Sequence, residues 1–114
     1  MTAMNRPTFD DAFLEEVVRR ILTVGRPLKV VLFGSHARGE ARPDSDLDLL
    51  IVEEGSHLPA HKRATPYRMA LTGIHPRKDI VVYTLAEIQD WAQVALAFVS
   101  TVLREGRVLY ERPR

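Results

Sequence analysis

Three short runs rich in β-branched and aromatic residues, separated by stretches with helical spacing, constrain the fold of this chain most. The runs are KVVLF at residues 29–33, DLDLLIVE at 46–53 and KDIVVY at 78–83. Their length and composition favour strands over helices, and the first has the apolar character of a strand covered on both faces. Alternating helices and strands are typical of α/β domains, so the sequence predicts a small mixed sheet of three to four strands flanked by helices.

Helical spacing is clearest before the first run. Apolar side chains recur three and four positions apart between residues 8 and 24, at Phe9, Phe13, Val17, Ile21 and Val24. Thr8 is the predicted N-cap of this helix and Gly25 its end. Residues 58–73 predict an irregular helical segment, in which Pro66 argues for a break.

The last third of the chain predicts a further helix and a short strand. Thr84, with Glu87 three positions on, forms the pattern of a helix N-terminus. The helix is predicted over residues 85–103, either continuous or divided near Trp91. Residues 107–110 are then predicted to form an edge strand or an extended tail.

Length and composition narrow the possible functions. With 114 residues, the sequence predicts one domain over residues 1–114, without room for a second, substrate-binding domain. A net charge of +1 argues against direct nucleic-acid binding by the whole surface, and the lack of cysteine excludes disulfides and thiol nucleophiles. No run is long and apolar enough for a membrane span or a secretory signal, so a cytoplasmic location is expected.

The stretch between the first two predicted strands has the features of a phosphate-binding turn. It reads GSHARGEARPDS over residues 34–45, which favours turns and a brief helix. Gly34 allows the backbone close to a phosphate, Ser35 offers a hydroxyl and a backbone N–H, and the helix start has favourable polarity for an anion. Arg38 is a further candidate for phosphate contact. Gly34, Ser35 and Arg38 are therefore the predicted nucleotide-binding residues.

Three aspartates follow this turn on two predicted strands. Asp46 and Asp48 alternate along the second run, so their side chains share one face of the strand. Asp79 lies near the start of the third run. Carboxylates repel one another unless a cation lies among them, and Mg²⁺ prefers carboxylate and phosphate oxygens. Asp46, Asp48 and Asp79 are therefore the predicted metal-binding and catalytic residues, and Asp79 is placed to help activate an acceptor hydroxyl.

Gly34-Ser35, a spacer, Asp46-Leu47-Asp48 and a later Asp79 together resemble the signature of the DNA polymerase beta-like nucleotidyltransferase superfamily. The expanded form, GSHARG followed by SDLDLLI, is most similar to the minimal nucleotidyltransferases of bacteria and archaea, and the resemblance spans nearly the whole chain. It implies the fold of that superfamily, Mg²⁺ as the metal and ATP as the donor. His36 departs from the pattern, because such proteins often have arginine there.

The minimal family commonly serves as the antitoxin beside an RNase toxin of the higher eukaryotes and prokaryotes nucleotide-binding (HEPN) type. The resemblance therefore implies AMP transfer to a hydroxyl of such a partner, with tyrosine as the expected acceptor. An alternative from a different class is a non-catalytic binding module that neutralises a toxin by forming a complex. A glycosyltransferase that uses Asp-x-Asp is a third option, against which the Gly-Ser turn and the short chain argue.

Each candidate residue also has a purely structural interpretation. Asp79 could pair with Lys78 or Arg77 at the start of a strand, Ser35 could cap the short helix, and Arg38 could be a solvated loop charge. The four histidines lack metal-ligand spacing and are predicted to be surface or loop residues: His36, His57, His61 and His75. A basic group in the 61–68 segment favours a solvated helix face over a partner site.

Residues 91–103 read WAQVALAFVSTVL, so a helix there would be apolar nearly all round. One small core cannot bury every side of such a helix. We therefore expect part of its surface to pack against another chain, either a second copy or a helical partner.

Overall fold

The structure is a computed structural model that describes residues 10–42, 45–75, 77–90 and 93–113. Its strands are β1 (Lys29–Phe33), β2 (Leu47–Glu53), β3 (Lys78–Thr84) and β4 (Arg107–Glu111). Its helices are α1 (Asp11–Val24), α2 (Ser35–Arg38), the 3-10 turn η2 (Ala60–Lys62), α3 (Thr65–Ala70), α4 (Leu85–Asp90) and α5 (Gln93–Glu105). Helices and strands alternate along most of the chain, as the sequence predicts.

The strands form one mixed sheet in the order β3-β2-β1-β4. β1 pairs antiparallel with both β2 and β4, and β2 pairs parallel with β3. The predicted small mixed sheet is confirmed, and residues 107–111 form the edge strand rather than a tail. β4 carries a bulge opposite the Val30–Val31 step of β1.

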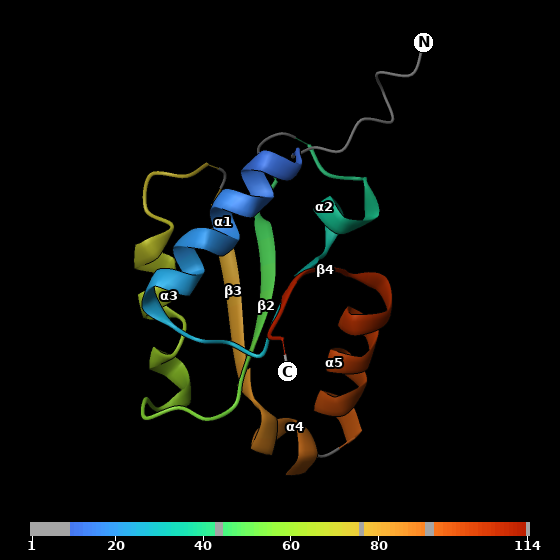
Figure 1. Cartoon of the computed structure of the whole chain (residues 1–114). Coiled ribbons are helices and arrows are strands. Elements are labelled where there is room, and N and C mark those ends of the chain that lie inside the picture. Colours follow the sequence, from blue (N-terminus) through green and yellow to red (C-terminus); the bar gives the residue numbers. More distant parts are fainter. Residues whose placement is uncertain (1–9, 43–44, 76, 91–92, 114) are drawn as a thin grey trace.

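Helices cover the two faces of the sheet unequally. α1 and α3 lie over one face, where α1 and the strands bury a large apolar cluster around Val17, Ile21 and Leu49 (Figure 1). α5 lies toward the other face, where the buried cluster is smaller and centres on Val31, Leu50 and Val102. The side chains of β2 divide between the two clusters by alternation, which confirms the predicted phase of this strand.

α1 begins at Asp11, two residues later than predicted. Asp10, rather than Thr8, caps the helix by accepting a hydrogen bond from the Phe13 backbone N–H at 2.8 Å; Thr8 lies outside the described residues. The helix ends at Gly25, as predicted. A Cβ on Gly25 would lie 2.5 Å from the Tyr67 hydroxyl, so packing against α3 also demands glycine there.

The 58–73 segment is irregular, as predicted, because it divides into η2 and α3. Pro66 lies in the first turn of α3, where its lost N–H costs no helical hydrogen bond. Tyr67 is 2% exposed, and its hydroxyl donates to Glu53 at the end of β2. This bond ties the irregular segment to the sheet.

The last predicted helix is divided. α4 ends at Asp90 and α5 begins at Gln93; Trp91, the predicted point of division, lies outside the described residues. Thr84 and Glu87 form the predicted capping pair, since the Thr84 N–H donates to the Glu87 carboxylate and the Glu87 N–H donates to the Thr84 hydroxyl. Among the described residues, no helix is both long enough and apolar enough to cross a bilayer.

Candidate functional site

The predicted site residues meet at one end of the sheet because of how the strands are ordered. β1 ends where the antiparallel β2 begins, and β3 begins at the same level because it is parallel to β2. The register places Phe33 beside Asp48 and Asp48 beside Asp79. Residues separated by 46 positions in the sequence, 33 and 79, therefore lie in one row across three strands.

Asp48 and Asp79 occupy equivalent positions on the two parallel strands. By alternation, Asp48 shares a face with Leu50, and Asp79 shares that face with Val81, on the α5 side of the sheet. β2 begins at Leu47, one residue later than predicted, so Asp46 directly precedes the strand. The Leu47 N–H donates a hydrogen bond to the Arg77 carbonyl at 2.8 Å. Asp46 and Asp79 are exposed, whereas Asp48 is half-buried.

Electrostatic coupling among the three aspartates is visible at Asp48. Burial raises the pKa of its carboxyl, and the negative charges of Asp79 and Asp46 raise it further. His36 and Arg38 oppose this shift. Repulsion between neighbouring carboxylates at this end of the sheet destabilises the anionic form of Asp48, and a bound cation would relieve that repulsion.

Gly34 is required by both its backbone conformation and its neighbour. Its φ of 76° lies in the left-handed region, and a Cβ there would come within 2.2 Å of Asp48 Oδ2. The carbonyl of Gly34 accepts from the N–H groups of Ala37 and Arg38, which starts α2. The Gly-Ser turn therefore lies directly against the Asp48 carboxylate, as a shared nucleotide and metal site would need.

α2 is a single turn that begins with Ser35 and ends at Arg38. The first N–H groups of any helix have no acceptor within that helix, so the turn presents donors at its start. The Arg38 side chain is 49% exposed, and its Nε lies 2.9 Å from a carboxylate oxygen of Glu40, which agrees with the solvated interpretation. The Arg38 guanidinium also interacts electrostatically with the Asp48 carboxylate. A phosphate contact from Arg38 stays a prediction.

His36 is not the surface or loop residue that the sequence predicts. It is 8% exposed, and its Nε2 lies 2.8 Å from the Ser45 carbonyl oxygen, which fastens α2 to the segment that leads into Asp46. The other three histidines are exposed, as predicted: His57, His61 and His75. The burial of His36 depends on its contact with Ser45, nine residues further on, and no local pattern in the sequence signals that contact.

The fit of these residues to Mg²⁺ depends on what completes its coordination. Within the described ranges, no group of three or more histidine, aspartate or glutamate side chains converges closely enough to form a metal cage. Mg²⁺ is ordinarily held by one or two carboxylates together with phosphate oxygens and water, so such a cage is not needed. Asp48, with its raised carboxyl pKa and its position against Gly34, has the properties of a ligand in such a mixed site.

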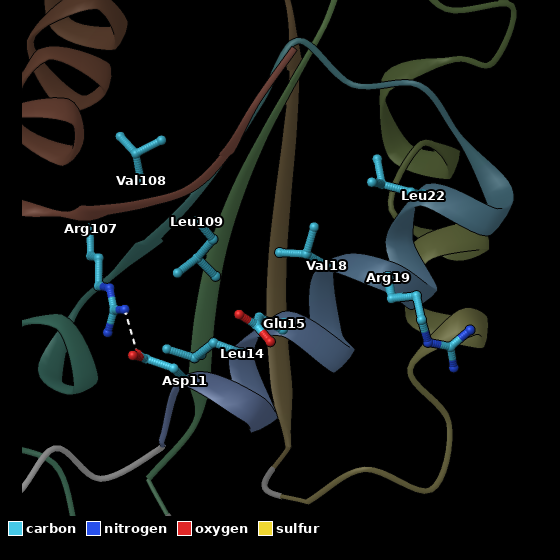
Figure 2. Close-up of a pocket in the computed structure, with 9 residues that line it drawn as sticks. All are labelled: Asp11, Leu14, Glu15, Val18, Arg19, Leu22, Arg107, Val108 and Leu109. Carbon is cyan, nitrogen blue, oxygen red and sulfur yellow. Dashed lines mark hydrogen bonds and ion pairs between the residues drawn. The ribbon is translucent and has the colours of Figure 1, made fainter. Parts of the chain in front are cut away.

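A separate pocket lies elsewhere on the molecule. A groove of about 500 Å³ runs between α1 and β4, with Leu14, Val18 and Leu22 along the helix side (Figure 2). An ion pair between Asp11 and Arg107, at 2.8 Å, bridges one end of it. Asp48 and Asp79 form a carboxylate row on the opposite face of the sheet from the one that α1 covers. This groove is therefore separate from the carboxylate row.

Comparison with known proteins assigns the chain to a family. The profile of the nucleotidyltransferase domain matches residues 11–109. A relative from Methanocaldococcus jannaschii, named as a "putative protein adenylyltransferase", is 34% identical over 89 residues, which cover 75% of this chain and 81% of the relative. The chain therefore belongs to the nucleotidyltransferase domain family and is a nucleotidyltransferase, as its motifs predict.

Solved structures share the same fold at low sequence identity. A "putative nucleotidyltransferase" from Sulfolobus solfataricus superposes with a TM-score of 0.60 at 20% identity, covering 94% of this chain and 89% of that one. A toxin–antitoxin structure with AMP-PNP gives a TM-score of 0.65 at 17% identity, with coverages of 87% and 73%. A mutant of the toxin–antitoxin MntA–HpeT gives 0.59 at 13% identity, with coverages of 91% and 75%. The predicted nucleotidyltransferase fold is confirmed by these similarities.

Proposed function

We propose that this chain is a Mg²⁺-dependent protein adenylyltransferase that transfers AMP from ATP to a hydroxyl group of a partner protein. The observation that carries the proposal is the alignment of Asp48 and Asp79 in one row, with the Gly34 turn directly against Asp48. That arrangement joins a phosphate-binding turn to two carboxylates on one open end of a sheet. The relative named for protein adenylylation supports protein as the acceptor.

The steps of the reaction are divided between the Gly34-Ser35 turn and the carboxylates. In the transfer, the acceptor oxygen bonds to the α-phosphorus of ATP while the bond from that phosphorus to the bridging oxygen breaks, and pyrophosphate leaves with the electron pair. The backbone of Gly34 and Ser35 holds the triphosphate, with Arg38 as a further phosphate contact. Asp79, on the edge strand β3, accepts the proton that the hydroxyl releases.

Asp46, Asp48 and Asp79 are the carboxylates proposed to hold Mg²⁺ at this end of the sheet, together with phosphate oxygens of the nucleotide. The bound metal would neutralise charge on the triphosphate and polarise the attacking oxygen. Asp48 is the central ligand, because it lies in register with Asp79 and against the Gly34 turn. Asp46, directly before β2, adds an exposed carboxylate to the same end of the sheet.

The proposed partner is a toxin of the HEPN type, with a tyrosine hydroxyl as acceptor. Two of the similar structures are toxin–antitoxin assemblies, one of them with AMP-PNP, and their shared fold supports a role of this kind. The exposed surface of α5 supports a protein partner as well, since Leu103 is a large apolar side chain that is 40% exposed.

The test is incubation of the wild-type protein with Mg²⁺, labelled ATP and the product of the adjacent gene, followed by mass measurement of that product. A gain in steps of one AMP is expected. The matched control is the double variant Asp46→Asn, Asp48→Asn, which keeps side-chain size but removes both charges and should transfer nothing. An unmodified partner that still co-purifies with the wild type would instead support the non-catalytic binding module.

A further inference from the structure

A pocket of about 240 Å³ opens between the Gly34 turn and α5, beside the carboxylate row. Its walls come from Phe33, Gly34 and Arg38 on one side and from four residues of α5 on the other: Phe98, Thr101, Val102 and Glu105. Gly34 thus has the Asp48 carboxylate in contact range of its Cα and also borders the pocket. Any nucleotide whose phosphates bind at the Gly34 turn has this cavity within immediate reach.

The pocket contains an aromatic surface suited to stacking. The Phe98 ring is held edge-on by two others, with centroids 5.9 Å from Phe33 and 6.3 Å from Tyr83. The Phe98 side chain is nevertheless 39% exposed, whereas Phe33 and Tyr83 are half-buried. Nucleobases stack on aromatic side chains, and a ring that its neighbours hold in place but that stays accessible is well suited to such a contact.

The polar side chains of the pocket are Arg38, Thr101 and Glu105. Arg38 is the proposed phosphate contact, and its charge interacts with that of Glu105. Thr101 and Glu105 are four positions apart on α5, so they lie on the same face of the helix. The Glu105 carboxylate repels phosphate oxygens but accepts a hydrogen bond from an exocyclic amino group. Of the parts of ATP, only the adenine presents both a flat apolar face and such an amino group.

The sheet order separates this pocket from the place where the acceptor must approach. Asp79 belongs to β3 at one edge, Asp48 to the neighbouring β2, and the pocket adjoins β1 on the other side of Asp48. We propose that this pocket holds the nucleobase of the donor nucleotide, with Phe98 stacking on the base and Glu105 accepting from its amino group. The inference rests on the proposed function and adds to it the residues that select the donor base.

The first test compares ligands that differ by the base. Binding of ATP and of inorganic tripolyphosphate, each with Mg²⁺, is measured by calorimetry for the wild type, Phe98→Ala and Leu103→Ala. Loss of one base stack should weaken ATP binding about 10-fold in Phe98→Ala and leave tripolyphosphate binding unchanged. Leu103 is the matched control, because it lies on the same helix with almost the same exposure, 40%, and does not line the pocket.

The second test probes Glu105 with inosine triphosphate, which carries a carbonyl oxygen where ATP carries the amino group. The wild type should prefer ATP, since the Glu105 carboxylate repels that oxygen. In Glu105→Gln the amide can donate to it, so the preference should narrow about 10-fold or reverse. The Glu105 side chain is 55% exposed, so this variant leaves the fold intact even if Phe98→Ala proves unstable.

The outcomes separate this inference from the function on which it rests. ATP binding that is equal in all variants, or an ATP preference that Glu105→Gln does not alter, would overturn the base pocket. The proposed function would still stand in that case, provided that the wild type transfers AMP. A wild type that binds neither ATP nor tripolyphosphate would overturn the proposed function itself.

Discussion

Asp48 is the residue at which stability and function conflict. Burial and two neighbouring carboxylates raise the pKa of its side chain, so the charged form is held in place at a cost to the folded state. A polar group that opposes folding in this way is typical of a functional site.

Replacing Asp48 should therefore separate the two properties. In the absence of Mg²⁺, Asp48→Asn should melt at a higher temperature than the wild type, because the repulsion from Asp79 and Asp46 is removed. Transfer should fall about 1000-fold, since a bound metal contributes several kcal/mol to the reaction. Thermal denaturation and a labelled-ATP assay measure the two effects. Glu15→Gln, an exposed carboxylate on α1, is the control; equal activity of the two variants would contradict the assignment.

Gly34 and Gly39 allow a comparison of two glycines at the two ends of α2. Both have positive φ, 76° and 74°, but ψ is −156° at Gly34 and 18° at Gly39. Alanine should therefore cost about 1–2 kcal/mol of backbone strain at Gly39, in the αL region, and up to about 3 kcal/mol at Gly34, in a region almost exclusive to glycine. Only at Gly34 does a Cβ meet Asp48 Oδ2, whereas Gly39 has open space around it. Gly34→Ala should turn the carboxylate away and lower transfer about 100-fold, while Gly39→Ala keeps it. Chemical denaturation measures the stability of both variants. Similar activity in the two would show that the contact with Asp48 is dispensable.

At the scale of elements, the junction from β3 to α4 is held by one carboxylate. Glu87 accepts from the Thr84 backbone and pairs with Arg63 at 2.6 Å, with side chains only 23% and 12% exposed. The Arg63 contact, helped by the Thr84 hydrogen bonds, lowers the pKa of the Glu87 carboxyl below its ordinary 4.5. This single side chain therefore links the end of β3, the start of α4 and the segment before α3.

A carboxyl with a lowered pKa stabilises the fold above its unfolded-state pKa, and that contribution disappears as the pH falls through the folded-state value. Glu87→Gln should cost about 1–2 kcal/mol at pH 7, from the weakened cap and the lost charge pair. The difference from the wild type should begin to shrink below pH 4.5, where the carboxyl of the unfolded chain becomes protonated, and should disappear once the pH falls below the lower pKa of the folded chain. Urea denaturation at a series of pH values from 7 to 3 measures this. A difference that is constant over that range would rule out the charge pair as its source.

At the scale of the whole molecule, an open sheet end and two unequal layers leave room for ligands and for another chain. The α1 face buries the larger apolar cluster, whereas on the α5 face the carboxylate row and the 240 Å³ pocket adjoin the smaller core. Ligands that bind only the folded state stabilise it by mass action.

ATP with Mg²⁺ should therefore stabilise the entire domain. At 100 times the dissociation constant, binding contributes about 2.7 kcal/mol, which raises the melting temperature of a domain of this size by roughly 10 °C. Addition of excess EDTA should abolish most of this gain. Differential scanning fluorimetry measures it, with the Asp46→Asn, Asp48→Asn variant as control; an equal gain in that variant would place the nucleotide elsewhere.

The partly exposed side chains of α5 predict association with another chain. Leu103→Glu should leave the domain folded, since this side chain is 40% exposed, but should weaken any complex that the helix makes. Light scattering of the protein alone and with the adjacent gene product measures the mass of the species. A wild type that stays monomeric under both conditions would exclude this interface.

The sequence alone was sufficient for the elements and for the candidate residues. Alternation along 46–53 and 78–83 fixed the phase of Asp48 and Asp79, because a strand has only two faces. The Gly34-Ser35 turn after an apolar strand indicated where the chain must bend and what it could bind there. Local spacing carries this information since it depends only on neighbouring residues.

Only the tertiary structure decided what lies next to what. The register that aligns Phe33, Asp48 and Asp79, the burial of His36 and the pocket under Phe98 all depend on contacts between distant segments. No local pattern encodes them, because burial and charge coupling arise when separate elements pack together. The sequence thus indicated which residues are candidates for the chemistry, and the packing of the sheet against its helices determined how they meet.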